Sequence, residues 1–321
     1  MSASDHGSSP IIIGISSCLL GEPVRWNGGH TRQPFLVETL GRFVEYVTVC
    51  PEVEVGMGVP RPTVRLERGE DGPRMVDGKN SIDWTPAMTR LSKKRVEMVD
   101  ERGLSGFILK KDSPTCGPFK VKLYDGGGST RQATGVFAAA LMERFPLLPV
   151  EDEGRLNDPG LRENFIERVF AYRRVEDLFT GPWRHGDVVA FHTREKLLLR
   201  SHDETRYREL GRLVAEGRRM PRPAFAARYA ELFMQAMKGK ATRRRNANVL
   251  QHVAGHFKRV EDQATRRELS ELIADYRSGL VPLVVPITMI RHLVRKHDVA
   301  VLQGQTYLDP HPKELMLRNH A

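Results

Sequence analysis

The sequence lacks long apolar runs and contains few cysteines. No stretch of about 18 apolar residues occurs among its 321 residues, so we expect no membrane-spanning helix. Residues 1–10 are small and polar and lack the basic and apolar regions of a signal peptide. The sequence therefore predicts a cytoplasmic protein with no membrane partner, in which residues 1–9 form a disordered tail.

The chain has only three cysteines, Cys18, Cys50 and Cys116. An odd number excludes a complete disulfide framework, and a reducing cytoplasm disfavours disulfides. We therefore expect the three thiols to be free, catalytic or bound to a metal.

Positive charge is in excess, and most of the excess lies in the second half of the chain. Residues 1–150 contain 19 lysines and arginines against 17 acidic residues, whereas residues 151–321 contain 31 against 23. A basic second half indicates a polyanionic partner such as RNA, although a basic surface without such a partner has the same composition.

The first 150 residues alternate between short β-branched apolar runs and longer segments with helical spacing. Such alternation is typical of a parallel sheet with right-handed helical crossovers. The predicted fold class is α/β, with an N-terminal Rossmann-like parallel sheet and flanking helices. Strands are expected at residues 11–15, 46–49 and 106–109, and helices at residues 35–43, 85–103 and 134–145.

The rest of the chain is predicted to form an all-α C-terminal domain. Residues 151–160 are acidic and contain glycine and proline, so we place a boundary there between domains at residues 10–155 and 160–321. Pro282 and Pro286 are expected to interrupt any regular helix between residues 281 and 290. Apolar stripes with helical spacing occur in residues 187–215, 223–237, 242–258 and 264–276.

Each cysteine lies at, or just after, the end of a predicted parallel strand. Since ligand sites in open α/β sheets lie beyond the carboxyl ends of the strands, we expect the three thiols to converge. Three buried, inert cysteines are the alternative. Spacing does not decide between the two, because it matches no compact zinc or ferredoxin motif. Three ligands rather than four would leave a metal position open for a substrate.

Three motifs follow one another around the cysteines. They are Ser17-Cys18-Leu19-Leu20-Gly21 with Val24-Arg25, then Cys50-Pro51-Glu52 with a tail through Gly56, Gly58, Pro60, Arg61 and Pro62, and then Ser113-Pro114-Thr115-Cys116-Gly117. In this order they resemble the TudS-type thiouracil desulfidase family over about residues 10–150. That family usually has an acidic residue and a glycine shortly after Val-Arg. This chain has Asn27-Gly28 there, so no acid role is carried over to that position.

A second set of stretches lies in the C-terminal half. It comprises Phe191-His192 with Lys196-Leu197-Leu198, residues 248–258, residues 276–286 and residues 305–308. These stretches resemble the YbgA-like helical domain that is fused to the first module in RudS-type tRNA 4-thiouridine desulfidases. The resemblance implies an enzyme that acts on tRNA rather than on a free base.

The resemblance also implies a mechanism. Cys18, Cys50 and Cys116 would hold a 4Fe–4S cluster, and an iron without a protein thiolate would bind the soft thiocarbonyl sulfur and polarise the C=S bond. Water would then attack the ring carbon, with Glu52 as general base and Ser113 as hydrogen-bond donor or proton relay. A solvated Glu52 and a turn-forming Ser113 are the alternatives.

Basic residues in two regions are candidates for substrate or RNA contacts. Arg25, Arg61, Lys110 and Lys111 lie in the cysteine loops and could bind a phosphate or the base, or contribute only surface charge. The densest basic run, residues 238–246, precedes an amphipathic helix. Its Arg243, Arg244 and Arg245 are expected to contact RNA phosphates, although a solvated helix start is the ordinary explanation of such a run. His192, His252 and His256 are expected to contact RNA or to pack, rather than to bind a metal.

Together these features predict a 4Fe–4S-dependent desulfidase that converts 4-thiouridine in tRNA to uridine in a net hydrolytic reaction. The thiolated base would have to leave the tRNA stack to reach the iron. Two alternatives stay open: a desulfidase of free thiouracil, and a non-enzymatic RNA-binding or redox-sensing metalloprotein.

Overall fold

The computed structural model describes residues 10–79 and 81–320, apart from the side chain of Asp100. The chain divides into two compact units, Met1–Asp158 and Pro159–Ala321, which we call the N-terminal unit and the C-terminal unit. The predicted disordered tail, residues 1–9, lies outside the described residues. No helix in the described part of the chain is long and apolar enough to cross a membrane.

A four-stranded parallel sheet forms the centre of the N-terminal unit, and its strand order is β2-β1-β5-β8. The three predicted strands are confirmed. Gly14 of the central strand lies against the Phe107 ring of its neighbour, so closely that a Cβ would come within 2.2 Å of that ring. Only glycine allows this contact. The strands are β1 (Ile12–Ser16), β2 (Glu45–Val49), β5 (Gly106–Leu109) and β8 (Val150–Asp152).

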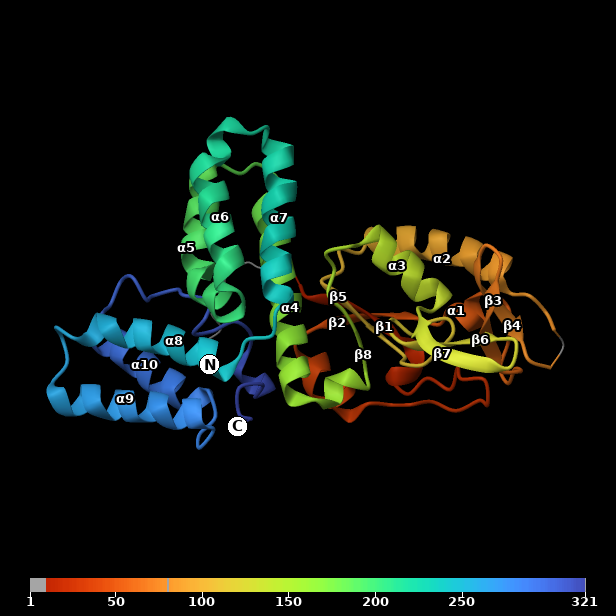
Figure 1. Ribbon diagram of the computed structural model, residues 1–321, viewed down its shortest axis with the longest axis horizontal. Coiled ribbons are helices and arrows are strands. Elements are labelled where there is room, and N and C mark those ends of the chain that lie inside the picture. The colour runs from red at the N-terminus through yellow and green to blue at the C-terminus, as the bar shows by residue number, and fades with distance from the viewer. Residues whose placement is uncertain (1–9, 80, 321) are drawn as a thin grey trace. The chain divides into compact units, whose positions relative to one another are not determined.

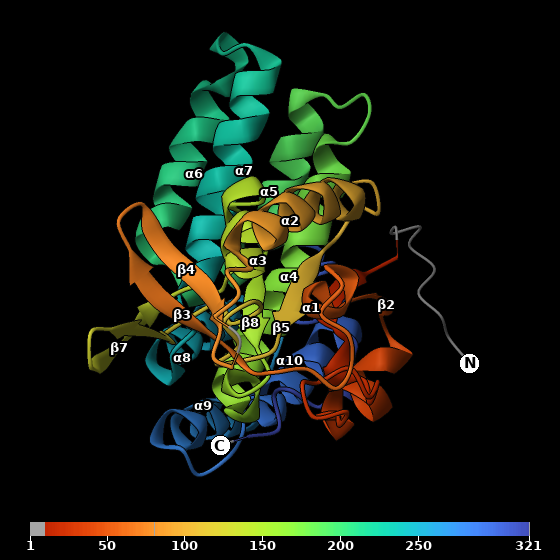
Figure 2. The ribbon, with the colours of Figure 1, turned by 90° about the vertical axis from the view of Figure 1, so that its right-hand side faces the viewer.

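Helices α2 (Thr85–Asp100) and α3 (Val136–Arg144) lie side by side in this unit (Figures 1 and 2). The Phe107 ring meets the Phe137 ring edge-on at 5.8 Å and so joins α3 to the sheet. The helix predicted at residues 35–43 is instead a π-helical turn, Phe35–Thr39, followed by a 3-10 turn. A short helix, α1 (Pro51–Glu54), follows β2.

A second four-stranded sheet, with the order β4-β3-β6-β7, was not predicted. It consists of two antiparallel hairpins joined by parallel pairing of β3 with β6. Its strands turn only a few apolar side chains inward, among them Leu66, Met75 and Leu123, and these pack with Met88 of α2. The many charged residues between them hide the alternation that identifies a strand. The bounds are β3 (Val64–Gly69), β4 (Gly72–Asp77), β6 (Val121–Asp125) and β7 (Gly128–Ala133).

The C-terminal unit is helical, as predicted. Figure 1 shows two groups of helices within it, α4–α7 and α8–α10. Its helices in the described part of the chain are α4 (Pro159–Phe179), α5 (His185–His202), α6 (Glu204–Glu216), α7 (Arg222–Lys238), α8 (Arg243–Ala254), α9 (Gln263–Ser278) and α10 (Val284–Lys296).

Two details of the helix prediction were wrong. The segment 187–215 is not one helix, because the Asp203 side chain accepts the amides of Thr205 and Arg206 and so starts α6 anew. Pro286 does not interrupt a helix. It lies in the first turn of α10, where the backbone N–H that proline lacks would have had no partner within the helix.

Candidate functional site

The three cysteines line one cavity of about 420 Å³ in the N-terminal unit. Cys18 follows β1, Cys50 follows β2, and Cys116 lies in the loop after β5. All three thiols are free. The cavity therefore lies beyond the carboxyl ends of three neighbouring parallel strands, which is where an open α/β sheet usually binds its ligand.

Hydrogen bonds of the backbone or the side chain hold each cysteine in place. The carbonyl of Cys18 accepts the Thr31 amide at 2.9 Å. Cys50 precedes α1, and its Sγ lies 3.9 Å from the Val24 carbonyl oxygen. The Cys116 amide donates to Ser113 Oγ at 3.0 Å.

The start of α3 fixes the Cys116 loop. The amides of Val136 and Phe137 donate to the carbonyls of Pro114 and Thr115 at 3.1 and 3.0 Å. Gly135 makes this approach possible, because a Cβ there would stand 2.5 Å from the Thr115 oxygen. The loop is thus attached to a helix by the helix's own unpaired N-terminal amides.

The surroundings of the thiols disfavour free thiolates, so a group that takes them as thiolates would have to bring positive charge of its own. Burial raises the pKa of all three, and that of Cys116 most strongly. The Thr31 hydroxyl is buried beside Cys18 and lowers the pKa of that thiol, although the effect of burial is larger. A thiolate at Cys18 would give this hydroxyl an acceptor. The donor set therefore fits a metal-containing group.

The spacing of the donors bears on the kind of group. In the described part of the chain, no three His, Cys, Asp or Glu side chains are placed to bind one metal ion. A single ion needs thiolates at about 2.3 Å, whereas a cluster distributes its ligands over several metal atoms. The three thiols around one cavity fit the second arrangement.

Glu52 lies in the same cavity, close to Arg61 and Ser113. Its Oε2 accepts Arg61 Nε at 2.9 Å and Nη2 at 2.5 Å, while its Oε1 lies 3.5 Å from Ser113 Oγ. Since Ser113 Oγ accepts the amides of Thr115 and Cys116, the hydroxyl proton can point to Glu52 or to a ligand. One carboxylate oxygen is therefore fixed by a guanidinium, and the other can accept a proton.

The four cations predicted in these loops all line the cavity, but they divide into two pairs. Arg61 is bound to Glu52, and Lys110 Nζ lies 2.5 Å from Glu153 Oε1. Arg25 has no ion-pair or hydrogen-bond partner for its side chain in the described ranges, and Lys111 Nζ has only Asp112 at 4.0 Å. Arg25 and Lys111 are therefore the cations that remain available to a ligand.

Sequence reasoning missed two residues near the cavity. Glu153 accepts both Lys110 Nζ and the Lys111 amide and is only 5% exposed, although its acidic segment was interpreted as a boundary between domains. Trp26 lines the cavity and is 46% exposed. Its place between Arg25 and a glycine-containing turn was the signal that could have identified it.

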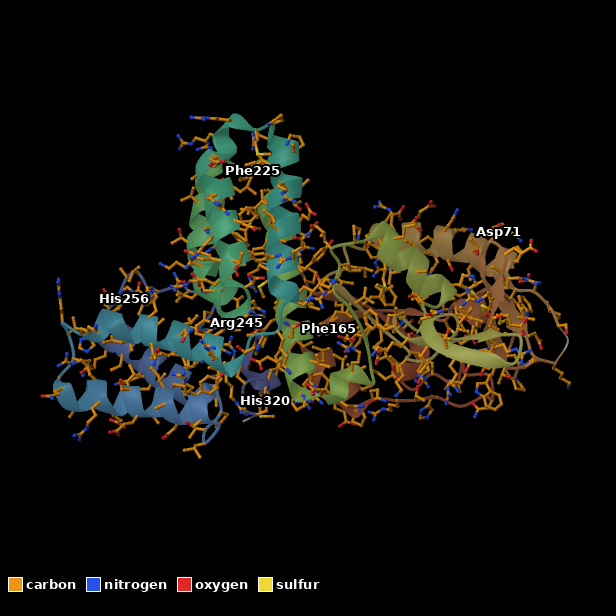
Figure 3. All side chains as sticks on the ribbon, viewed as in Figure 1. Asp71, Phe165, Phe225, Arg245, His256 and His320 are labelled. Atoms are coloured by element: carbon orange, nitrogen blue, oxygen red, sulfur yellow. The ribbon has the colours of Figure 1, made fainter. Side chains whose placement is uncertain are left out.

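The predicted RNA contacts Arg243, Arg244 and Arg245 start α8 in the C-terminal unit, and Figure 3 labels Arg245. Arg245 donates to the His202 carbonyl at 2.6 Å, and the Arg243 side chain packs against Gly279 at the end of α9. Arg244 is exposed and has no side-chain partner within the described sequence. The three arginines thus have different surroundings, and Arg244 is the most available.

The three histidines also differ. His192 stacks on the Tyr207 ring at 5.6 Å, and its Nδ1 lies 3.2 Å from the Tyr229 hydroxyl, so it packs in the helical core. His252 and His256 are exposed and meet edge-on at 5.6 Å. Partial burial and the positive charges of Arg200 and Lys196 lower the pKa of His252. Lys196 and Arg200 of α5 therefore lie close enough to His252, at the end of α8, to act on its charge, and Arg200 is also paired with Glu204 at 2.9 Å.

The parallel sheet and the cavity with three cysteines define a class of α/β protein that binds a metal-containing group beyond its strand ends. Comparison with known proteins is more specific. The family described as 2-thiouracil desulfurase matches residues 13–153, and a family described as a protein of unknown function (DUF1722) matches residues 196–312. The chain belongs to the 2-thiouracil desulfurase family and carries a DUF1722 region after that domain.

Three individual proteins are similar to parts of the chain. The uncharacterized protein YbgA of Escherichia coli (strain K12) is 31% identical over 158 residues, which are 49% of this chain and 94% of YbgA. The uncharacterized protein YbbK of Bacillus subtilis (strain 168) is 30% identical over 152 residues, 45% of this chain and 97% of YbbK. A solved structure of the [4Fe-4S]-dependent thiouracil desulfidase TudS is 28% identical over 47% of this chain and 95% of that chain, with a TM-score of 0.39.

Proposed function

We propose that this chain is a desulfidase in which Cys18, Cys50 and Cys116 hold a 4Fe–4S cluster, and that its substrate is 4-thiouridine in tRNA. The observation that carries the proposal is the meeting of three free cysteines with Glu52 and Ser113 in one cavity. Membership of the 2-thiouracil desulfurase family supports the reaction type. Free thiols and an iron–sulfur cofactor both fit a reducing cytoplasm.

The reaction is the net hydrolysis of a thiocarbonyl. When bound, the cluster would supply a Lewis-acidic iron for the substrate sulfur. Glu52 Oε1 takes a proton from a water molecule as the water oxygen bonds to the ring carbon, and Arg61 keeps the carboxylate oriented through Oε2. The carbon–sulfur bond breaks, the ring gains a carbonyl oxygen, and sulfur leaves as hydrogen sulfide. Thiocarbonyl and water thus become carbonyl and hydrogen sulfide without an oxidant or a reductant.

Ser113 carries the second part of the proton transfer. Its oxygen is held by two backbone amides, so its hydroxyl proton is directed away from them towards the cavity. From there it can donate to the leaving sulfur and recover a proton from Glu52, which lies 3.5 Å away. Arg25 and Lys111 are the cations available for a nucleotide phosphate or a base oxygen.

Charge supports tRNA as the substrate. The second half of the chain carries most of the net charge of +10. Arg244 is exposed in the C-terminal unit and Lys196 of α5 is half-buried, and phosphates could bind to both. A free thiouracil remains the second candidate, because a cavity of about 420 Å³ admits a single base without a polynucleotide.

The test begins with anaerobic reconstitution with iron and sulfide, followed by metal and sulfide analysis. The protein is then mixed with thiolated tRNA, 4-thiouridine or 2-thiouracil while the near-ultraviolet absorbance of the thiocarbonyl is followed. We expect about four irons per chain and loss of that absorbance. A much higher kcat/KM on tRNA, with inhibition by unmodified tRNA, would support the tRNA substrate. Faster turnover of the free base, unaffected by tRNA, would contradict it.

The cysteines provide the matched variants. Cys18→Ala, Cys50→Ala and Cys116→Ala should each abolish turnover and alter the visible spectrum of the cluster. Zinc in place of iron, or full activity of any one of these variants, would contradict the cluster proposal and favour a non-enzymatic metalloprotein.

A further inference from the structure

Trp26 is an exposed aromatic residue on the wall of the cavity. It lines the same cavity as the three cysteines and Glu52, and 46% of its surface is exposed. In the described part of the chain, its ring contacts no other aromatic ring and no guanidinium. Trp84 and Trp183 differ from it, because Trp84 packs against the core of the second sheet and Trp183 meets the Phe179 and Phe225 rings. Trp26 is therefore a residue of the cavity lining whose aromatic ring has no ring or guanidinium partner among the described residues.

A tight turn holds Trp26 in position. The Arg25 amide donates to the Gly29 carbonyl at 3.1 Å, and the Gly28 amide donates to the Arg25 carbonyl at 2.9 Å. Gly28 has a φ of +75°, which side chains rarely adopt. The exposed ring is therefore carried by a hydrogen-bonded turn rather than by a loose segment.

Arg61 connects this turn to the carboxylate. Its backbone amide donates to the Trp26 carbonyl at 2.8 Å, and its guanidinium binds Glu52 Oε2. The Arg61 side chain is only 4% exposed, so it holds both contacts inside the protein. One residue thus fixes the backbone that carries the aromatic face and the group that would act on a ligand lying against that face.

We propose that Trp26 is the stacking platform for the pyrimidine ring of the substrate. The inference rests on the proposed desulfidase function and adds the residue that binds the ring. A base that leaves a tRNA stack loses its neighbours, and stacking on an aromatic side chain replaces part of what is lost. Such stacking tolerates any base because every base has a π-face. Trp26 therefore binds the pyrimidine ring of any base, and the group that binds the thiocarbonyl sulfur selects the thiolated base.

Stacking acts on binding more than on chemistry. The ring lies against Trp26 both before and during the attack of water, so its removal should raise KM and leave kcat nearly unchanged. Trp26→Ala should raise KM for 4-thiouridine roughly 5- to 150-fold. Trp26→Phe should recover most of the loss, whereas Trp26→Leu, which is apolar but not aromatic, should not.

Fluorescence gives a reading that does not depend on turnover. The chain has three tryptophans, so Trp84→Phe with Trp183→Phe leaves Trp26 as the only indole. The 4-thiocarbonyl of 4-thiouridine absorbs in the near ultraviolet, where tryptophan emits. Rapid mixing of this reconstituted double variant with 4-thiouridine should therefore quench the emission before product forms, and uridine, which does not absorb there, serves as the control. A Trp26→Phe variant of the wild-type chain, which keeps the other two indoles, should show weaker quenching, because neither of these indoles lines the cavity.

The outcomes separate the two proposals. If the double variant turns over 4-thiouridine without quenching, and Trp26→Ala leaves KM unchanged, the stacking role is overturned. If the emission is quenched but no thiopyrimidine is ever turned over, Trp26 is a base-binding residue and the desulfidase proposal fails. If Trp26→Ala loses its cluster spectrum or melts earlier, while Trp26→Leu behaves like the wild type in KM, the residue is structural and the inference is overturned.

Discussion

Each unit of the chain buries an arginine against a glutamate, and the two pairs have different surroundings. Arg61 and Glu52 are 4% and 15% exposed, and both line the cavity with the cysteines. Arg318 and Glu167 are 9% and 3% exposed. Burial opposes the ionisation of Glu167, but Arg318 and His202 together overcome it and hold its pKa well below the usual range.

The comparison shows that burial and charge pairing do not by themselves identify a reactive site. Glu167 uses both oxygens inside the protein, one for Arg318 Nη2 at 2.8 Å and one for His202 Nε2 at 3.0 Å. Glu52 uses one oxygen for Arg61 and directs the other to Ser113 and the cavity. An oxygen that a ligand can reach is what distinguishes the first pair.

The same substitution in the two pairs should therefore have opposite results. Glu52→Gln keeps the shape but cannot take a proton, so we expect kcat to fall roughly 100- to 10,000-fold with the cluster spectrum retained. Steady-state kinetics on thiolated tRNA and the visible spectrum measure the two effects. Glu167→Gln is the matched control and should leave kcat of the folded enzyme unchanged. A large fall of kcat in Glu167→Gln, or no fall in Glu52→Gln, would contradict the distinction between the two pairs.

The free energy of unfolding should show the reverse order, with a larger loss in Glu167→Gln than in Glu52→Gln. Glu167→Gln removes one of the two carboxylates beside the buried Arg318 and leaves Glu163 at 3.5 Å, so the free energy of unfolding of the C-terminal unit should fall by roughly 3 kcal/mol, the low end for a broken buried pair. Urea unfolding followed by far-ultraviolet circular dichroism measures this loss. Glu52→Gln should lower the free energy of unfolding less, because Glu52 is itself 15% exposed and Arg61 keeps its hydrogen bond to the Gly58 carbonyl at 2.9 Å. Equal losses of unfolding free energy in the two variants would mean that the two ion pairs stabilise the fold equally.

Acid should destabilise the C-terminal unit through His311, whose pKa Arg318 and Glu167 both affect. Burial, with a smaller contribution from Arg318, lowers the pKa of His311 to about 4, while Glu167 acts in the other direction. The unfolded chain, in which histidine titrates near 6.5, then binds more protons between these two values, so stability is complete above pH 6.5 and falls as pH decreases towards 4. The loss should be about 3 kcal/mol. His311→Asn should flatten that part of the urea midpoint against pH, and an unchanged slope would refute this assignment.

The smallest effect is expected for two arginines at the start of α8. Arg245 has a hydrogen-bond partner for its side chain, whereas Arg244 has none among the described residues. Arg244→Ala should weaken tRNA binding a few-fold and reduce the slope of log affinity against log salt by about 1, as for one phosphate contact. Arg245→Ala should chiefly reduce stability, because its guanidinium holds the His202 carbonyl. Salt-dependent binding titrations and thermal melts distinguish these outcomes. A salt slope altered by Arg245→Ala alone would reverse the assignment.

Sequence alone predicted the part of the fold in which local pattern and topology agree. Continuous apolar runs such as residues 11–15 mark strands that are buried on both faces, and the position of a cysteine after each of three strands indicated a common site. The second sheet was missed because its hairpins bury only alternate residues among many charges. Glu153 was missed for a related reason: an acidic segment usually indicates solvent, and only the tertiary contact with Lys110 shows that it is buried.

The attachment of the Cys116 loop to α3 has a consequence for how the cofactor is acquired. Two helix amides and the Ser113 hydroxyl fix this loop through the polypeptide itself, without any help from the thiol. The loss of backbone freedom that an ordered ligand loop requires therefore occurs when the chain folds. In the proposed function, an incoming cluster would meet a preorganised loop, so little of its binding free energy would be spent on ordering that loop. In this respect the protein differs from small zinc domains, whose folding depends on the metal.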